Sequence, residues 1–136
     1  MSQEIVVNAV VGRDMDTVWS LWNSPEHIQR WMHASNDWEC TKAVNNLKVG
    51  GRFSFTLAAK NKSASFDFSG TYTAVELNKV IAFALYDKRT VSVLFDAKED
   101  GVHIIETFEM ENENPEEMQR VGWQAILDSF KNYCES

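Results

Sequence analysis

The sequence predicts an α+β fold in which a curved antiparallel β-sheet wraps around one long C-terminal helix. Between residues 38 and 109, short segments of alternating apolar and polar residues are separated by turn-forming pairs such as Gly50-Gly51 and Asp100-Gly101. This alternation with regular turns is typical of an antiparallel meander. The C-terminal segment instead repeats apolar side chains at the spacing of an amphipathic helix. The chain is therefore expected to place an apolar sheet face against an apolar helix stripe.

The length and charge of the chain limit its organisation and its partners. The chain has 136 residues and no Pro/Gly-rich linker or internal repeat, so we expect residues 1–136 to form a single domain. A net charge of -7 disfavours binding to nucleic acid or to an anionic membrane surface. Since neither a signal-peptide pattern nor a long apolar run is present, a cytoplasmic location is the expectation.

The N-terminal part is expected to contain one strand followed by two short helices. Residues 4–11 are rich in β-branched residues without helical spacing, which indicates a strand. Asp14 is placed to cap the first helix. Ser24 and Pro25 are typical of a second helix start, with proline in the first helical position, and this helix is expected to reach Trp31.

Six further strands are expected, and one face of the last five is strongly apolar. The predicted strand ranges are 38–44, 52–59, 66–75, 80–86, 90–97 and 102–109. The apolar face carries Phe53, Phe55, Leu57, Phe66, Phe68, Tyr72, Ile81, Phe83, Leu85, Val91, Val93, Phe95, Val102, Ile104 and Phe108. The opposite face is mostly polar, so one side of the sheet is expected to be buried and the other to face water.

The C-terminal helix is expected to cover the apolar sheet face. Its apolar stripe consists of Trp123, Ile126, Leu127, Phe130, Tyr133 and Cys134. We expect this helix to begin with Asn114 as its N-cap and Pro115 in the first helical position, with Glu117 completing a capping box.

The order of these elements resembles the helix-grip fold of the START-like, or Bet v 1-like (SRPBCC), superfamily. Within that superfamily the chain is similar to the branch related to activators of the heat-shock protein 90 ATPase. The segments that carry the resemblance are Val18-Trp19, Pro25-Glu26-His27-Ile28, Trp31, Ala34-Ser35, Asp37-Trp38, Leu47-Lys48-Val49-Gly50-Gly51, Phe66-Asp67-Phe68 with Gly70, and Asn114-Pro115 through Gly122-Trp123. The resemblance implies a cavity between sheet and helix that accepts lipids, polyketides or aromatic molecules.

The candidate ligand-binding residues are aromatic side chains of the sheet and helices together with one carboxylate. They are Trp31, Trp38, Phe55, Phe68, Tyr72, Phe83, Glu106, Phe108 and Trp123. Aromatic rings supply large apolar surfaces, and Trp and Tyr add a polar group that can orient a ligand. Core packing is the alternative interpretation for each of these rings.

Glu106 is the most informative of the candidates. It alternates with Ile104 and Phe108, so its carboxyl group is expected to point toward the apolar interior. Burial would raise its pKa unless a cation compensates. Three interpretations remain open: Glu106 contacts a ligand, it pairs with an arginine or lysine, or it lies at the wet end of the sheet.

No metal site, cofactor site or nucleophile motif is recognisable. The three histidines lie in a predicted helix, loop and strand without the spacing of paired metal ligands. Gly50-Gly51 lacks the rest of a phosphate-binding loop and is expected to form a tight turn. Cys40 and Cys134 have no C-x-x-C spacing and are expected to be small buried residues. We therefore expect neither a metal nor a cofactor.

Three functions fit these observations, and a small hydrophobic-ligand binding protein is preferred. The second is a cyclase-like or aromatase-like enzyme that uses the same pocket, with Glu106, Tyr72 and Asp37 as available acid–base groups. The third is a co-chaperone-like adaptor that stimulates a heat-shock protein ATPase through its outer surface, as the resemblance implies. The expected partner is a small apolar molecule, with a protein partner or a homodimer left open.

Overall fold

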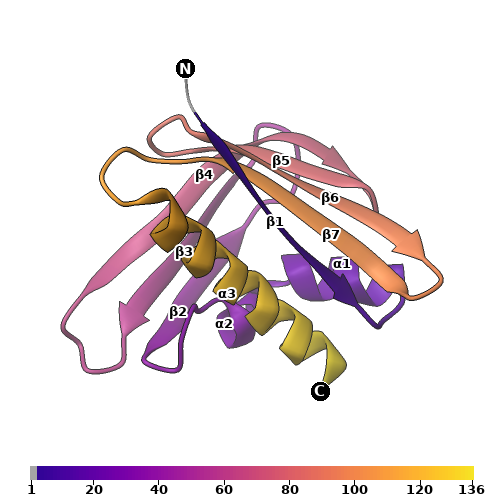
Figure 1. Cartoon of the computed structure of the whole chain (residues 1–136), viewed down its shortest axis with the longest axis horizontal. Helices are drawn as coiled ribbons and strands as arrows, with labels where there is room; N and C mark the ends of the chain where they lie inside the picture. The colour runs from indigo at the N-terminus through magenta and orange to yellow at the C-terminus, as the bar shows by residue number, and fades with distance from the viewer. Residues whose placement is uncertain (1–2) are drawn as a thin grey trace.

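A computed structural model describes residues 3–136 and shows a seven-stranded antiparallel sheet curled around a long C-terminal helix (Figure 1). In chain order the elements are β1 (Glu4–Val11), α1 (Met15–Asn23), α2 (Pro25–Trp31), β2 (Trp38–Asn45), β3 (Arg52–Ala59), β4 (Ser65–Glu76), β5 (Val80–Leu85), β6 (Thr90–Lys98), β7 (Gly101–Glu109) and α3 (Glu116–Glu135). The strand order β1-β7-β6-β5-β4-β3-β2 makes β2 to β7 a meander, with β1 added beside β7. The predicted α+β helix-grip fold is confirmed.

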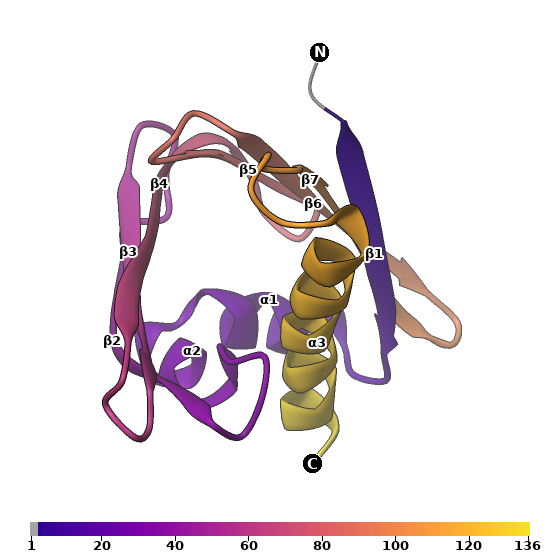
Figure 2. The ribbon, with the colours of Figure 1, turned by 60° about the vertical axis from the view of Figure 1, so that its left-hand side comes forward.

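The sheet forms an arch over α3 (Figure 2). Strands β2 to β4 stand on one side of the arch, β1 stands on the other, and α1 and α2 lie across the open base. The register shifts between Cys40 and Lys42 in β2 and between Tyr72 and Ala74 in β4. Such bulges bend a strand and increase its local twist, so these two irregularities help the sheet to curl.

α3 lies against β1 and hydrogen-bonds to the unpaired backbone edge of that strand. Gln124 accepts from the Asn8 amide at 3.4 Å and donates to the Asn8 carbonyl at 3.0 Å. Lys131 Nζ donates to the Val10 carbonyl at 2.6 Å, and Glu135 accepts from the Gly12 amide at 2.8 Å. The backbone groups of an edge strand need partners, and here helix side chains supply them.

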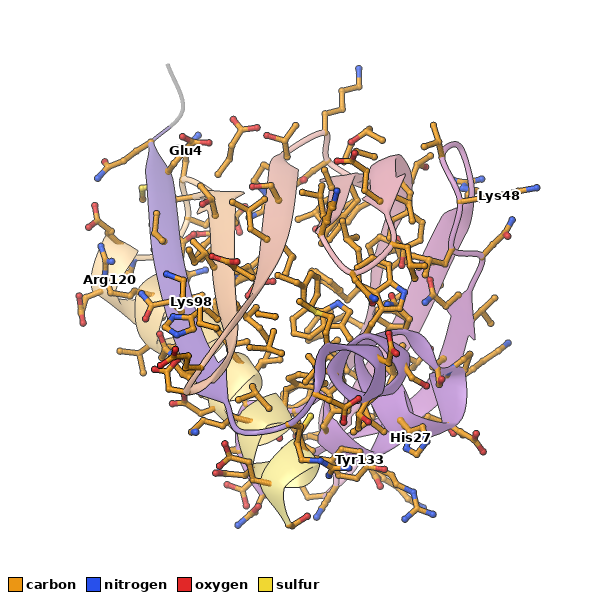
Figure 3. All side chains as sticks on the ribbon, turned by 90° about the vertical axis from the view of Figure 1, so that its right-hand side faces the viewer. Glu4, His27, Lys48, Lys98, Arg120 and Tyr133 are labelled. Atoms are coloured by element: carbon orange, nitrogen blue, oxygen red, sulfur yellow. The ribbon has the colours of Figure 1, made fainter. Side chains whose placement is uncertain are left out.

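Aromatic packing and a polar contact join α3 to the short helices. The Phe130 ring centroid lies 4.8 Å from those of both Trp22 and Trp31, in each case edge to face. Near the end of α3, the Tyr133 hydroxyl lies 2.6 Å from His27 Nδ1 on α2, and Figure 3 shows this pair at the base of the molecule. These contacts fix the C-terminal half of α3.

The predicted start of α3 is wrong, because the helix begins one residue later. Its N-cap is Pro115, which offers no side-chain hydrogen bond, so there is neither an Asn114 cap nor a capping box with Glu117. Asn114 is engaged elsewhere: its amide nitrogen and its Nδ2 donate to Glu111 Oε1 and Oε2 at 2.7 and 3.0 Å. A local loop contact therefore replaces the expected cap.

The two other predicted helix starts are confirmed in position. Asp14 caps α1 by accepting from the Thr17 amide at 3.2 Å, and hydrogen bonds from Thr17 hold the pKa of Asp14 below its ordinary value. Pro25 occupies the first turn of α2, although the Ser24 side chain makes no capping hydrogen bond.

The Gly50-Gly51 turn joins β2 to β3. Gly50 has a φ of 81°, and a Cβ on Gly51 would lie 2.1 Å from the Asn46 carbonyl oxygen. Only glycine fits such a close approach, so this pair forms the tight turn that was predicted.

None of the helices formed within residues 3–136 is long and apolar enough to cross a membrane.

Candidate ligand-binding cavity

A cavity of about 270 Å³ lies between α3 and the strands on the far side of the arch. Its apolar walls come from α1 and α2, from β3 and β4, and from α3. These wall residues are Trp22, Trp31, Met32, Leu57, Phe66, Phe68, Trp123, Ile126 and Leu127. Phe66 and Asn114 are the exposed residues of the lining, so the cavity reaches the surface near them.

A second, smaller cavity of about 40 Å³ extends the first one toward the sheet. The residues that line only this smaller space are Asn45, Phe53, Phe55, Tyr72, Ile81 and Phe83. Trp22, Trp31, Met32, Phe68 and Glu106 line both spaces. Glu106 therefore lies where the two cavities meet.

Glu106 points into the interior from β7, and no group within the described residues 3–136 pairs with its carboxyl group. Its neighbours in register are Val7 on β1 and Val93 on β6, both of them buried. The side chain is 8% exposed, and no hydrogen bond or ion pair reaches it within residues 3–136. Burial raises the pKa of Glu106 to about 8. The expectation of an inward carboxyl is thus confirmed, whereas the ion-pair and wet-end interpretations do not apply.

Because its pKa of about 8 lies above 7, whereas an ordinary glutamic acid has a pKa of 4.5, Glu106 is mostly protonated at neutral pH. A protonated carboxyl group can donate one hydrogen bond and accept others. A buried polar group without a partner is unfavourable, and a ligand that supplies that partner gains affinity. Glu106 is therefore the strongest polar anchor that the cavity offers.

Tyr72 is held by a polar relay across β4, β2 and α1. Its hydroxyl donates to Asn45 Oδ1 at 2.5 Å, and Asn45 Nδ2 donates to the Asn23 carbonyl at 2.8 Å. Burial raises the pKa of Tyr72 above its ordinary value. The hydroxyl proton is thus already engaged, so toward the smaller cavity Tyr72 can only accept.

Gln119 organises the loop between β7 and α3. Although it is polar, Gln119 is buried on α3. Its Nε2 donates to the carbonyls of Glu111 at 3.0 Å and Asn114 at 2.8 Å. Its Oε1 accepts from the Glu111 amide at 3.0 Å. The loop at the cavity mouth is consequently tied to the first turn of the helix.

Arg89 is the positive charge of the cavity lining. Its Nε donates to Asp87 Oδ2 at 2.6 Å, and its Nη1 lies 3.5 Å from the Glu109 carbonyl. The guanidinium group does not pair with Glu106, although both side chains line the same cavity. Asp87 therefore compensates the charge of Arg89 and leaves Glu106 unpaired.

Trp123 forms the α3 wall of the cavity. Its ring stacks on Phe108 with centroids 3.9 Å apart and meets Phe68 edge to face at 5.9 Å. Stacked and edge-to-face pairs are favourable beyond the area they bury. The indole is thereby held in one orientation against the cavity.

The structure brings together most of the predicted site residues. Trp31, Phe68, Glu106 and Trp123 line the larger cavity, and the smaller one adds Phe55, Tyr72 and Phe83. Two predicted residues line neither space. Phe108 is fully buried behind Trp123, and Trp38 packs against Phe66, with ring centroids 5.9 Å apart.

Sequence reasoning missed several lining residues, of which Gln119 and Arg89 matter most. Gln119 carried a usable signal, because it lies four residues before Trp123 and interrupts the apolar stripe of the helix with a polar group. Arg89 lies in a turn, outside the alternating apolar and polar residues of the predicted strands, so no sequence pattern identified it as a lining residue. Its position depends on the pairing of β5 with β6.

No cluster of three or more His, Cys, Asp or Glu side chains suited to a metal ion occurs in the part of the chain that the structure describes. Cys40 and Cys134 are both buried and unbonded to each other, as predicted.

Known proteins resemble this chain in both sequence and fold. Residues 14–135 match the family model described as activator of Hsp90 ATPase homolog 1-like protein. The AHSA1-like protein from Aeromonas hydrophila shares 42% identity over 98% of this chain and 92% of that one, with a TM-score of 0.93. A protein from Cytophaga hutchinsonii shares 43% identity with the same coverage and a TM-score of 0.81. A protein from Chromobacterium violaceum has the same fold at 17% identity, with a TM-score of 0.87 over 98% of this chain and 99% of that one. No curated protein matches this chain.

Proposed function

The chain belongs to the family of activator of Hsp90 ATPase homolog 1-like proteins, and on that premise we propose that it binds a small hydrophobic molecule between its sheet and α3. The observation that carries the proposal is the unpartnered carboxyl group of Glu106, buried in a cavity walled by tryptophan and phenylalanine. Apolar pockets with a few convergent polar groups are typical of small-molecule sites.

The size of the cavity supports a compact ligand. Pockets for drug-sized molecules measure roughly 300 to 1,000 Å³, so a volume of about 270 Å³ suits a molecule of one or two rings. Glu106 would bind a polar atom at the inner end of such a ligand, while Trp31, Phe68 and Trp123 would contact its apolar body. The net charge of -7 fits a cytoplasmic protein without a nucleic-acid or membrane partner.

The tryptophans provide an internal test of this proposal. Of the five in the sequence, Trp22, Trp31 and Trp123 line the cavity, whereas Trp38 lies outside it. In a screen of small apolar compounds, a ligand in the cavity should shift the indole N–H resonances of the three cavity residues and leave that of Trp38 in place. Equal shifts at every tryptophan, or none, would contradict the proposal.

A matched pair of variants then locates the site. Leu57→Trp fills the cavity from β3 and should abolish binding of whichever compound shifted the resonances. Ile105→Trp places the same side chain on the outer face of β7, where Ile105 is already exposed, and should leave binding unchanged. Thermal unfolding of both variants checks that each of them remains folded.

An adaptor function is the second candidate, because the matched family is described by its activation of Hsp90 ATPase. On the outer face of the sheet, Leu94 and Ile105 are register partners and are 43% and 39% exposed. Contiguous exposed apolar surface is typical of protein-binding sites, and this pair would form the centre of such a surface. Stimulation of a heat-shock protein ATPase that is lost in Leu94→Glu and retained in Leu57→Trp would favour the adaptor.

The same ligand screen tests for an enzyme. A compound recovered unchanged after long incubation favours binding alone. Conversion that requires Glu106 would favour acid–base catalysis in the same cavity, because a buried carboxyl group with a raised pKa can transfer a proton near neutral pH.

A further inference from the structure

The cavity combines aromatic faces with one unpartnered carboxyl group. Trp22, Trp31, Phe68 and Trp123 line the same space as Glu106. The faces of tryptophan rings attract cations, and a carboxylate adds a charge-assisted hydrogen bond. An aromatic enclosure with a single acid is a chemical environment suited to an ammonium group.

The remaining charges around the cavity favour a cation over an anion. Arg89 and Glu111 are the other charged side chains of the lining, and Arg89 is compensated by Asp87 at 2.6 Å. The Glu111 carboxylate has no cationic partner within residues 3–136. Together with the net charge of -7, this arrangement leaves an excess of negative charge around the cavity, which favours a cationic ligand.

Apart from Arg89 before β6 and Glu111 in the loop after β7, no ionised side chain within residues 3–136 lines the cavity with Glu106. β1 and β6 present Val7 and Val93, and the inner face of β3 and β4 presents aromatic and aliphatic side chains together with the Tyr72 hydroxyl. The short helices present tryptophans and Met32, and α3 presents Trp123 and the neutral Gln119. A positive charge that a ligand carries to this point is therefore compensated by Glu106.

Building on the proposed function, we propose that the ligand is a hydrophobic amine, whose ammonium group pairs with the Glu106 carboxylate between the tryptophan faces.

The protonation of Glu106 gives this pairing a measurable signature. In the empty protein the pKa of Glu106 is about 8, so the group is mostly neutral at pH 7. When a protonated amine binds, the carboxyl group releases its proton to solvent and the ion pair remains. Below pH 8 the affinity for the amine should rise by up to about tenfold per pH unit, since one proton is released per ligand. A neutral ligand that accepts a hydrogen bond from the protonated carboxyl group has the opposite slope, because its affinity falls above pH 8.

The probes are a matched series of 2-phenylethylamine, 2-phenylethanol and 3-phenylpropionate. Calorimetric titration at pH 6, 7 and 8, in two buffers of different ionisation enthalpy, gives the affinity and the number of protons released. Glu106→Gln removes the acid while keeping the shape of the side chain. Glu39→Gln, on the exposed face of β2, changes the net charge equally without touching the cavity.

The expected result is that the amine binds at least tenfold more tightly than the alcohol at pH 8, with its affinity rising from pH 6. It should lose at least tenfold in affinity in Glu106→Gln and nothing in Glu39→Gln. Equal or tighter binding of the alcohol or the carboxylate would overturn the amine assignment while leaving a ligand-binding cavity. If none of the three probes shifts the indole resonances of the cavity tryptophans but another compound of the apolar screen does, the amine assignment fails and the proposed function stands. If no compound of the screen shifts them, both fail.

Discussion

The indole ring of Trp123 on α3 lies flat against the ring of Phe108 on β7, with centroids 3.9 Å apart and an interplanar angle of 9°. This stack attaches the N-terminal half of α3 to the sheet, while Phe130 attaches the C-terminal half to the short helices. It also fixes the tryptophan face that the cavity presents to a ligand.

Trp123→Ala should therefore weaken the fold and the site together. Large aromatic-to-alanine changes in protein cores cost about 3 to 5 kcal/mol, and the lower end applies because Trp123 is only half-buried. Urea unfolding should show this loss, and Trp123→Phe should restore more than half of it by keeping a ring on Phe108. A near-neutral Trp123→Ala would show that the stack contributes little to holding α3.

Glu106 should make the stability of the protein depend on pH. Its folded-state pKa is raised to about 8 from 4.5, so its contribution is fully favourable below pH 4.5 and is lost as the pH rises to 8. At about 1.4 kcal/mol per pKa unit, the loss amounts to roughly 5 kcal/mol at most. Glu106→Gln cannot ionise, so it should match the wild type near pH 4.5 and exceed its unfolding free energy at pH 8.

Urea unfolding of both proteins between pH 4.5 and 9 measures this difference. Glu39→Gln, which changes an exposed carboxylate, should run parallel to the wild type. Parallel curves for Glu106→Gln and the wild type would mean that Glu106 ionises as freely in the folded protein as in the unfolded one.

Gly122→Ala should stabilise the protein by about 1 kcal/mol. A Cβ at this position in α3 would meet nothing within 4 Å, and alanine is the better helix former by about that amount. Gly70→Ala is the contrasting change, because its Cβ would lie 2.5 Å from the Ala84 carbonyl oxygen and 2.9 Å from the Phe53 ring. Thermal melting should rise for the first variant and fall for the second, and a fall in both would contradict the open space around Gly122.

Gln119→Leu should loosen the loop at the cavity mouth. The change removes three hydrogen bonds between Gln119 and the backbone of the loop, leaving buried groups without partners at a cost of about 2 to 3 kcal/mol. Hydrogen exchange at the Glu111 amide should accelerate. Asn114→Ala, which removes one exposed side-chain contact, should cost less than about 1 kcal/mol. A larger loss for Asn114→Ala than for Gln119→Leu would reverse this order.

The sequence predicted the fold closely because the strands alternate without interruption over most of their lengths. The period-2 pattern places Ile104, Glu106 and Phe108 on one face whatever the exact turn geometry, so the inward carboxyl could be predicted before the structure. The start of α3 could not, because Asn114 has two competing partners and the contact with Glu111 replaces the cap. Arg89 likewise acquires its place only when β5 and β6 pair, which a local pattern does not contain.

The α3 side chains that occupy the edge of β1 also limit how this protein can associate with other copies of itself. An intermolecular sheet grows by adding a strand to free backbone groups, and the Asn8 amide and carbonyl, the Val10 carbonyl and the Gly12 amide are already taken. The other edge is β2, where a bulge separates Cys40 from Lys42 and Gln29 donates to the Thr41 carbonyl. Addition of further strands is thus obstructed at both edges of the sheet. A chain that ended ahead of Gln124 would lack the α3 side chains that block the edge of β1.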